Sequence, residues 1–80
     1  MTSELKSDWD VKVAEYQKKS KIIVRRGVTF INTFEVAIRL GEDVKSIQWK
    51  AAYGSLKNLA KRWGRPYWFK ETEIDRLLGI

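Results

Sequence analysis

The sequence predicts one small domain, residues 1–80, that is mainly α-helical with a small β component. Four segments repeat apolar residues at spacings of three and four, which is the period of a helix with one buried face. A β-branched run broken by Gly27 and an aromatic run after Pro66 instead have the composition of short strands. Because so short a chain has a thin core, most of its four tryptophans, three tyrosines and three phenylalanines are expected to be structural.

The first helix is expected from Asp8 to Lys19, within an N-terminal segment of residues 1–20. Ser7 can cap its start, and the acidic first turn and basic last turn suit the helix dipole. Its apolar stripe is narrow and consists of Trp9, Val13 and Tyr16. Two interpretations follow: this helix caps the fold, or it mediates contact with another protein or a second copy of the chain.

Residues 21–31, KIIVRRGVTFI, predict one or two short strands around a turn at Gly27. Arg25 and Arg26 then lie at an exposed corner. The next residues, NTFE, have the form of a capping box, with Asn32 as the N-cap and Glu35 three positions later.

A second helix is therefore expected from Thr33 to Leu40, and Gly41 is a natural C-terminal stop. Its buried face comprises Phe34, Ala37 and Ile38.

The longest periodic segment predicts a single helix from Ser46 to Trp63. On a helical wheel its core face consists of Ala52, Leu56, Leu59 and Trp63, with Trp49 and Ala60 at the edge. Opposite them lies a lysine ridge, defined as Lys50, Lys57 and Lys61, which no glutamate interrupts at i±4. The ridge is either an ordinary solvated face or a phosphate-binding surface. Gly54 within it would admit a phosphate backbone or mark a kink or boundary between two helices.

Gly64 is expected to end this helix, and Arg65–Pro66 to impose an extended or turn geometry. Pro66 confines the strand that follows, residues 67–69, to a sheet edge or a strand start. The last helix is expected to begin at Lys70 or Glu71 and to end at Leu78. Ile74, Leu77 and Leu78 are expected to close the core. The helix dipole explains the three acidic residues of this helix, Glu71, Glu73 and Asp75, better than catalysis or metal binding does.

Positive charge is unevenly distributed along the chain. Lys and Arg number 16 against 10 Asp and Glu, a net charge of +6, and no acidic residue occurs from Val44 to Lys70. A solvated helix normally mixes its signs, so this acid-free stretch is typical of an element that binds a polyanion.

The composition argues against an enzyme. Cysteine and histidine are absent, which excludes thiol nucleophiles, imidazole bases, disulfides and Cys/His zinc sites. No catalytic residue, metal site or cofactor is therefore expected. The N-terminus MTSELKSDWD lacks the basic start and apolar stretch of a signal peptide, so a cytoplasmic protein without membrane contact is expected.

The predicted order of helix, tight turn, basic helix, short extended corner and closing helix is that of a winged helix-turn-helix. The stretch FEVAIRLG, Phe34–Gly41, resembles the "EVA..LG" first helix of excisionase and MerR-type DNA-binding domains. RPYWFKETEIDRLL resembles their wing strand and closing helix, so the resemblance covers residues 30–78. The chain departs from that family in its longer basic helix and in a wing reduced to little more than GRP.

The resemblance implies a recognition helix from Ser46 in the major groove and a wing along an adjacent minor groove or backbone. It implies that Trp63, Trp68 and Phe69 belong to the core. The expected DNA-binding residues are Ser46, Gln48, Lys50, Tyr53, Lys57, Lys61, Arg62, Arg65 and Tyr67. Of these, Ser46, Gln48, Lys50 and Tyr53 are expected near base edges, and the remaining basic side chains at phosphates.

The expected function is that of a small sequence-specific double-stranded DNA-binding protein. Within the resemblance, it would be an excisionase-like recombination directionality factor or a transcriptional regulator of a phage or other mobile element. Tight binding would need an integrase or other protein partner, or cooperative self-association on DNA. Two alternatives remain at this point: stacking of single-stranded nucleic acid on Trp63, Tyr67 and Trp68, and a protein-interaction module or small inhibitor that uses the basic face.

Overall fold

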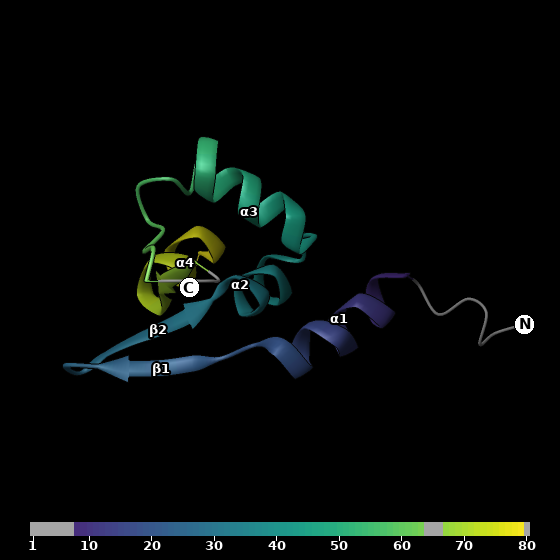
Figure 1. The fold of residues 1–80 in the computed structure, drawn as a ribbon, viewed down its shortest axis with the longest axis horizontal. Helices are drawn as coiled ribbons and strands as arrows, with labels where there is room; N and C mark the ends of the chain where they lie inside the picture. Colours follow the sequence, from purple (N-terminus) through teal and green to yellow (C-terminus); the bar gives the residue numbers. More distant parts are fainter. Residues whose placement is uncertain (1–7, 64–66, 80) are drawn as a thin grey trace, which may run out of the picture.

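The computed structural model describes residues 8–63 and 67–79, which form four α-helices and one three-stranded antiparallel sheet of order β1-β2-β3 (Figure 1). The elements are α1 (Asp8–Lys19), β1 (Ile22–Arg25), β2 (Val28–Asn32), α2 (Thr33–Leu40), α3 (Val44–Tyr53), β3 (Trp68–Lys70) and α4 (Glu71–Leu78). The architecture is mixed α/β, and its three strands lie close to the segments where strands were predicted.

The first two strands form a hairpin whose turn matches the prediction. Ile22 pairs with Ile31 and Arg25 with Val28, which leaves only Arg26 and Gly27 between the strands. Both turn residues have positive φ, 51° and 78°, as a two-residue type I′ turn requires. Arg25 and Arg26 are exposed at this turn, as expected.

Helix α2 also confirms its prediction, because its ends are specified locally. The Asn32 side-chain oxygen accepts a hydrogen bond from the Glu35 backbone N–H at 3.0 Å, which is the expected N-cap. Gly41 adopts the left-handed conformation, φ 69°, that commonly ends helices. The Glu35 carboxylate does not complete a capping box; instead it accepts a hydrogen bond from Arg39 Nε at 2.8 Å.

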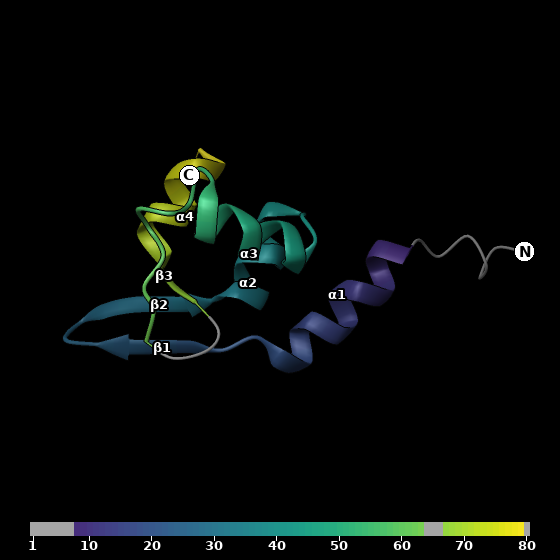
Figure 2. The same ribbon diagram turned by 45° about the horizontal axis from the view of Figure 1, so that its top comes forward.

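One face of the sheet carries the core. Helices α2, α3 and α4 lie on the same side of the sheet in both ribbon views (Figure 1 and Figure 2). The main buried cluster consists of Tyr16, Ile31, Val36, Ala37, Ile47, Ala51, Leu56, Phe69 and Ile74. Burying a side chain the size of Val, Ile or Phe stabilises a fold by about 1.5–3 kcal/mol, so this cluster supplies most of the stabilisation.

The predicted edge strand and closing helix are present, but part of their predicted core is not. Phe69 is fully buried, and β3 lies at one end of the strand order, as Pro66 required. In α4 only Ile74 is buried among the three expected core residues, whereas Leu77 and Leu78 are 54% and 39% exposed. The sheet has only three strands, and α4 contacts just β2 and β3 of it, so its last turn lies beyond the covered area.

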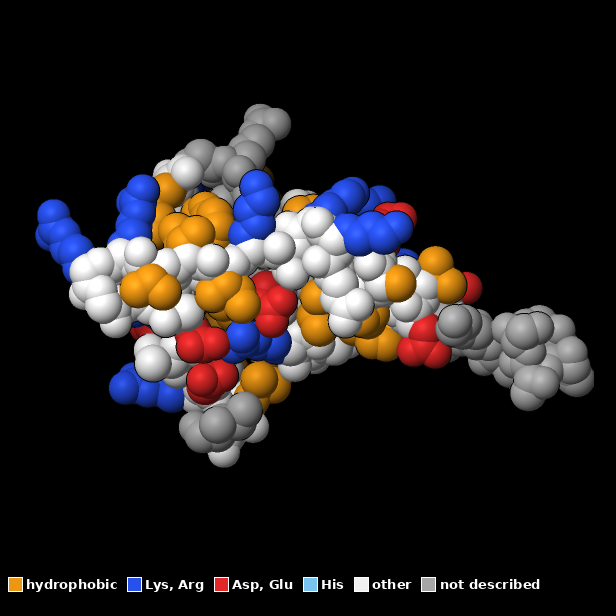
Figure 3. All heavy atoms as spheres, turned by 90° about the horizontal axis from the view of Figure 1, so that it is seen from below, with side chains coloured by type: hydrophobic (Ala, Val, Ile, Leu, Met, Phe, Trp, Pro, Cys, Tyr) orange, Lys and Arg blue, Asp and Glu red, His pale blue; other side chains and the backbone are white. Residues whose placement is uncertain are grey.

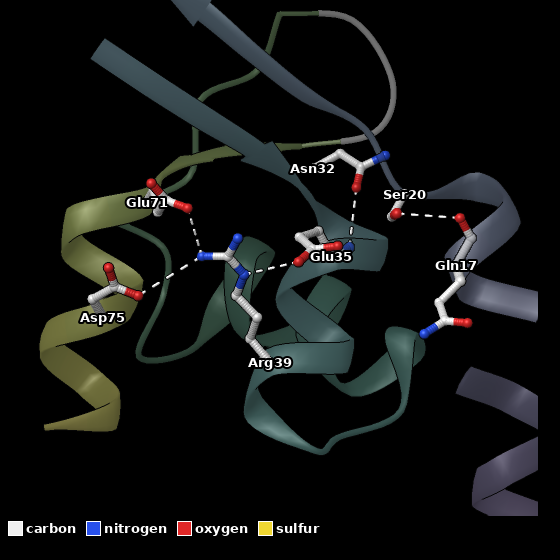
Figure 4. A network of polar contacts seen from close by, with 7 residues as sticks. All are labelled: Gln17, Ser20, Asn32, Glu35, Arg39, Glu71 and Asp75. Carbon is white, nitrogen blue, oxygen red and sulfur yellow. Dashed lines mark hydrogen bonds and ion pairs between the residues drawn. The ribbon is translucent and has the colours of Figure 1, made fainter. Parts of the chain in front are cut away.

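Arg39 joins α2 to α4 (Figure 4). Its guanidinium group contacts Glu35 on its own helix. It also contacts Glu71 Oε2 at 2.9 Å and Asp75 Oδ1 at 3.8 Å on α4. Glu71 and Asp75 thus each contact Arg39, in addition to the favourable interaction with the dipole of α4 that was expected of them.

Helix α1 is attached to the rest of the fold near its middle and at its C-terminal end. Near its middle, Tyr16 is buried in the main cluster, and its hydroxyl contacts the start of α3. At its C-terminal end, the carbonyl of Lys19 accepts a hydrogen bond from Asn32 Nδ2 at 3.0 Å. These contacts favour the interpretation that this helix caps the fold, although its N-terminal turns extend away from the other elements (Figure 1).

Candidate nucleic-acid interface

The candidate interface begins with two helices joined by only three residues. Helix α2 ends at Leu40, and α3 begins at Val44 after Gly41, Glu42 and Asp43. Asp43 caps α3 by accepting a hydrogen bond from Lys45 N–H at 3.0 Å. The two helices contact each other, so the second one is presented to solvent on a fixed support.

Helix α3 has one buried and one exposed stripe. Ile47 and Ala51, four residues apart, are fully buried against the core. The exposed stripe, which we define as Lys45, Gln48, Trp49 and Tyr53, repeats at spacings of three and four on the other side. The predicted phase of this helix is therefore wrong at Trp49, which was expected at the core edge and is 60% exposed. Tyr53, which was expected to be accessible, is 77% exposed.

The prediction of one helix from Ser46 to Trp63 is also wrong, because α3 ends at Tyr53 and Gly54 is its C-cap. A Cβ atom at Gly54 would lie 3.0 Å from Lys50 Cα and 3.2 Å from Trp49 Cζ3. Gly54 therefore marks the end of the helix, which was one of the alternatives considered from the sequence. Because it has no side chain, it also leaves room for the Trp49 ring.

The lysine ridge does not exist as a continuous helix face. Lys50 is half-buried, and its Nζ lies 2.6 Å from Glu42 Oε1. Lys57 is exposed, in the turns that follow α3. Lys61 forms an isolated antiparallel bridge with Trp68. Of the three lysines, only Lys57 keeps the exposed and unpaired surroundings that the wheel predicted.

Glu42 also engages Ser46, whose hydroxyl donates to the same carboxylate oxygen at 3.1 Å. The hydrogen bond from Lys50 holds the pKa of Glu42 below its usual value. Ser46 and Lys50, expected to read base edges, are therefore bound to this carboxylate. Gln48 and Tyr53, from the same expected set, are exposed.

The segment expected to be the wing is closed by a pair of backbone hydrogen bonds. Lys61 N–H donates to the Trp68 carbonyl at 2.7 Å, and Trp68 N–H donates to the Lys61 carbonyl at 2.9 Å. This pairing places Lys61 beside β3, on the side away from β2. Arg65 lies outside the described residues.

Next to the Lys61–Trp68 pairing, Arg62 is exposed and its guanidinium group lies 5.5 Å from the centre of the Tyr67 ring. Tyr67 is half-buried against the main cluster, and its carbonyl accepts a hydrogen bond from Thr33 Oγ1 at 3.2 Å. The Tyr67 ring therefore lies beside the Arg62 guanidinium group. Because Tyr67 is half-buried, its ring is less accessible to nucleic acid than we expected from the sequence.

Trp63 does not belong to the main core. It is 42% exposed and packs edge-on against Phe30, with ring centres 4.7 Å apart. Phe30 is adjacent to the core residue Ile31 on β2, so its side chain points to the opposite sheet face. Arg25 lies 4.8 Å above the Trp63 ring, which brings the end of β1 next to Trp63. Trp68, the other tryptophan expected in the core, is half-buried.

Seen from below, Lys and Arg side chains project around the rim of the molecule, including the β1–β2 turn at the left (Figure 3). Asp and Glu side chains gather near the centre of this face and close to the start of α1. Near the candidate interface, Glu42 is paired with Lys50 and Asp43 with Lys12. The local negative charges are thus neutralised, which leaves the positive charge of the acid-free stretch dominant.

The wheel placed Trp49 at a core edge, and Lys45 and the arginine pair Arg25 and Arg26 were not among the expected DNA-binding residues. A different phase of the same segment, with Ile47 and Ala51 inward, would have placed Lys45 and Trp49 on the exposed stripe. The position of Arg25 beside Trp63 depends on a long-range contact for which the sequence has no local signal.

No helix within residues 8–63 and 67–79 is long and apolar enough to cross a membrane. Comparisons of the chain with protein-family models, with curated proteins and with solved structures found no match.

Proposed function

We propose that the protein binds double-stranded DNA as a winged helix-turn-helix, with α2 as the supporting helix and α3 in the major groove. The observation that carries this proposal is the exposed stripe of α3, on a helix that follows a three-residue turn and within a stretch that has no acidic residue. An α-helix about 10–12 Å in diameter fits the major groove, which is about 12 Å wide.

The sheet supports the winged form of this fold. In the proposal, the pairing of β2, β3 and Lys61 forms the base of the wing, and the segment between Lys61 and Trp68 is the wing. The exposed Arg62, together with Arg65, would contact the DNA backbone there, while the hairpin turn at Arg25 and Arg26 is an addition to the expected arrangement.

In the proposed complex, the exposed side chains divide into those that contact base edges and those that contact phosphates. Lys45 and Gln48, on the first two turns of α3, face solvent where base edges would lie, and Gln48 can form two hydrogen bonds with adenine. Lys57 and Arg62 are exposed and supply phosphate contacts, which give affinity but no sequence information. Ser46 and Lys50 act indirectly, by holding Glu42 at the start of α3.

Within this proposal, the biological role is that of a recombination directionality factor or a transcriptional regulator of a phage or other mobile element. A single module of this size binds DNA weakly, so site-specific binding requires repeated sites or a protein partner such as an integrase. Binding to one and to several copies of a selected site measures this dependence.

The proposal is tested by fluorescence anisotropy with a short random-sequence duplex and one of its single strands, at several salt concentrations. The protein is expected to prefer the duplex. The double variant Lys57→Ala/Arg62→Ala is expected to lower the salt slope by about two, one for each lost phosphate contact.

The matched control is Lys18→Ala/Arg76→Ala, which removes the same charge from exposed positions on α1 and α4. It is expected to leave the salt slope within about 0.5 of the wild-type value. Absence of duplex binding at low salt would contradict the proposal, as would preference for the single strand.

A further inference from the structure

Trp49 and Tyr53, which we call the aromatic pair, form an exposed apolar surface at the end of α3. Their ring centres lie 6.3 Å apart with planes inclined at 53°. With 60% and 77% of their surfaces exposed, they are among the most exposed large apolar side chains of the described residues. Neither ring belongs to the main core or to the half-buried residues that pack against it, so core packing does not explain why these positions are aromatic.

The position of Trp49 is restricted by the helix end. A Cβ atom on Gly54 would come within 3.2 Å of Trp49 Cζ3, so this edge of the ring lies next to Gly54. The Trp49 side chain is nevertheless 60% exposed. Gln48, the neighbour of Trp49 on the exposed stripe, faces solvent as well. The helix therefore presents one amide and two rings together.

The size and surroundings of the aromatic pair argue against a protein interface. A stable dimer buries about 800 Å² on each partner, whereas two aromatic side chains cover at most about 300–500 Å². The other exposed residues of the segment 45–57 are polar or basic, namely Lys45, Gln48, Ser55 and Lys57. A small apolar surface within a basic surround is complementary to an apolar group on a polyanion.

The major groove of DNA offers one such group, the C5-methyl of thymine, which 5-methylcytosine also carries. We propose that the aromatic pair contacts pyrimidine C5-methyl groups, so that the protein selects A·T pairs through Gln48 on adenine and through the rings on thymine. This inference rests on the proposed function, because it requires α3 to lie in the major groove.

The test uses four short duplexes with equal numbers of phosphates. Two are alternating A·T duplexes with either thymine or uracil, and two are alternating G·C duplexes with either 5-methylcytosine or cytosine. Each methyl contacted is expected to tighten binding about three- to fourfold, the affinity equivalent of one buried methyl group. The double variant Trp49→Ala/Tyr53→Ala is expected to lose this preference while still binding all four duplexes.

Tyr53→Ala alone provides a second readout that does not depend on the packing of Trp49, and it is expected to lose part of the methyl preference. Leu77→Ala is the matched control, since Leu77 is 54% exposed on α4, and it is expected to keep the full preference. Equal affinity of the wild-type protein for methylated and unmethylated duplexes would overturn the inference and leave the proposed function standing. Failure to bind any of the four would instead contradict the proposed function.

Discussion

The hydroxyl group of Tyr16 accepts a hydrogen bond from the backbone N–H of Val44 at 3.1 Å. The same hydroxyl donates to Asp43 Oδ1 at 3.3 Å, and Lys12 forms an ion pair with the same carboxylate group. A residue of α1 thus helps to cap α3, the helix proposed to enter DNA. Through this contact, the N-terminal helix fixes the position of the candidate interface.

Tyr16→Phe is expected to lower the free energy of unfolding by about 1–2 kcal/mol, because it leaves Val44 N–H without its partner in a part-buried position. Urea denaturation measures this change. Tyr53→Phe removes a hydroxyl from a residue that is 77% exposed and is expected to change stability by less than about 0.5 kcal/mol. Equal effects of the two substitutions would show that the Tyr16 contact contributes nothing.

The capping carboxylate predicts a dependence of stability on pH. The hydrogen bond from Lys12, followed by that from the Lys45 backbone, lowers the pKa of Asp43 from 3.8 to about 2. Because its folded pKa lies below the unfolded value, Asp43 stabilises the fold above about pH 4. This contribution is lost as the pH falls through about 2.

This expectation is tested by measuring the urea midpoint from pH 5 to pH 2 for the wild type and for a variant of Asp43. The comparison with the variant is needed because carboxylates in general titrate in this pH range. Asp43→Asn keeps a side-chain oxygen that can cap α3 but cannot pair with Lys12, so its profile is expected to be flatter than that of the wild type. Glu15→Gln, an exposed position on α1, is the control and is expected to follow the wild-type profile.

Gly54→Ala distinguishes the observed helix end from the longer helix that the periodicity predicted. In a helix continuing through residue 54, alanine would raise stability by about 1 kcal/mol. In the observed structure its Cβ would lie 3.0 Å from the Lys50 backbone, so stability is expected to fall by about 1 kcal/mol or more. Thermal unfolding of this variant shows directly whether the substitution raises or lowers stability. Ser55→Ala, at the exposed neighbouring position, is the control.

Arg39→Lys is expected to destabilise the protein by about 1–2 kcal/mol, although the charge is kept. A lysine ammonium group cannot reproduce the fork by which the guanidinium contacts Glu35 and Glu71 from different nitrogens. A double-mutant cycle with Glu71→Gln measures the coupling between α2 and α4. Additive effects would contradict the assigned contact, and Arg76→Lys, at an exposed position of α4, is the control.

The parts of the fold that were predicted correctly have local signals. A glycine between β-branched residues marked the hairpin turn, and Asn32 and Gly41 marked the two ends of α2. The bounds of α1 and α4 followed from charges that suit the helix dipole and from the helical spacing of apolar residues.

The errors concentrate in residues 44–63, where long-range contacts decide the structure. The period of residues 46–63 fits one helix, but Lys61 pairs with Trp68 and Trp63 packs on Phe30, which a continuous helix would prevent. Lys50 is paired with Glu42, which lies eight residues earlier and before the helix, so a search at i±4 missed it. The exposure of Trp49 was missed for the related reason that the helix was given the wrong phase, whereas Tyr53 was already among the expected DNA-binding residues.

The measurement that tests the central claim most directly is an NMR titration of the ¹⁵N-labelled protein with a short DNA duplex. Trp9, Trp49, Trp63 and Trp68 each supply an indole N–H signal on a different part of the fold. We expect the Trp49 indole and the amides of Lys45, Gln48 and Tyr53 to shift most, while the Trp9 indole on α1 stays unchanged. Shifts confined to α1 or α4, with α3 unaffected, would contradict the assignment of α3 as the DNA-binding helix.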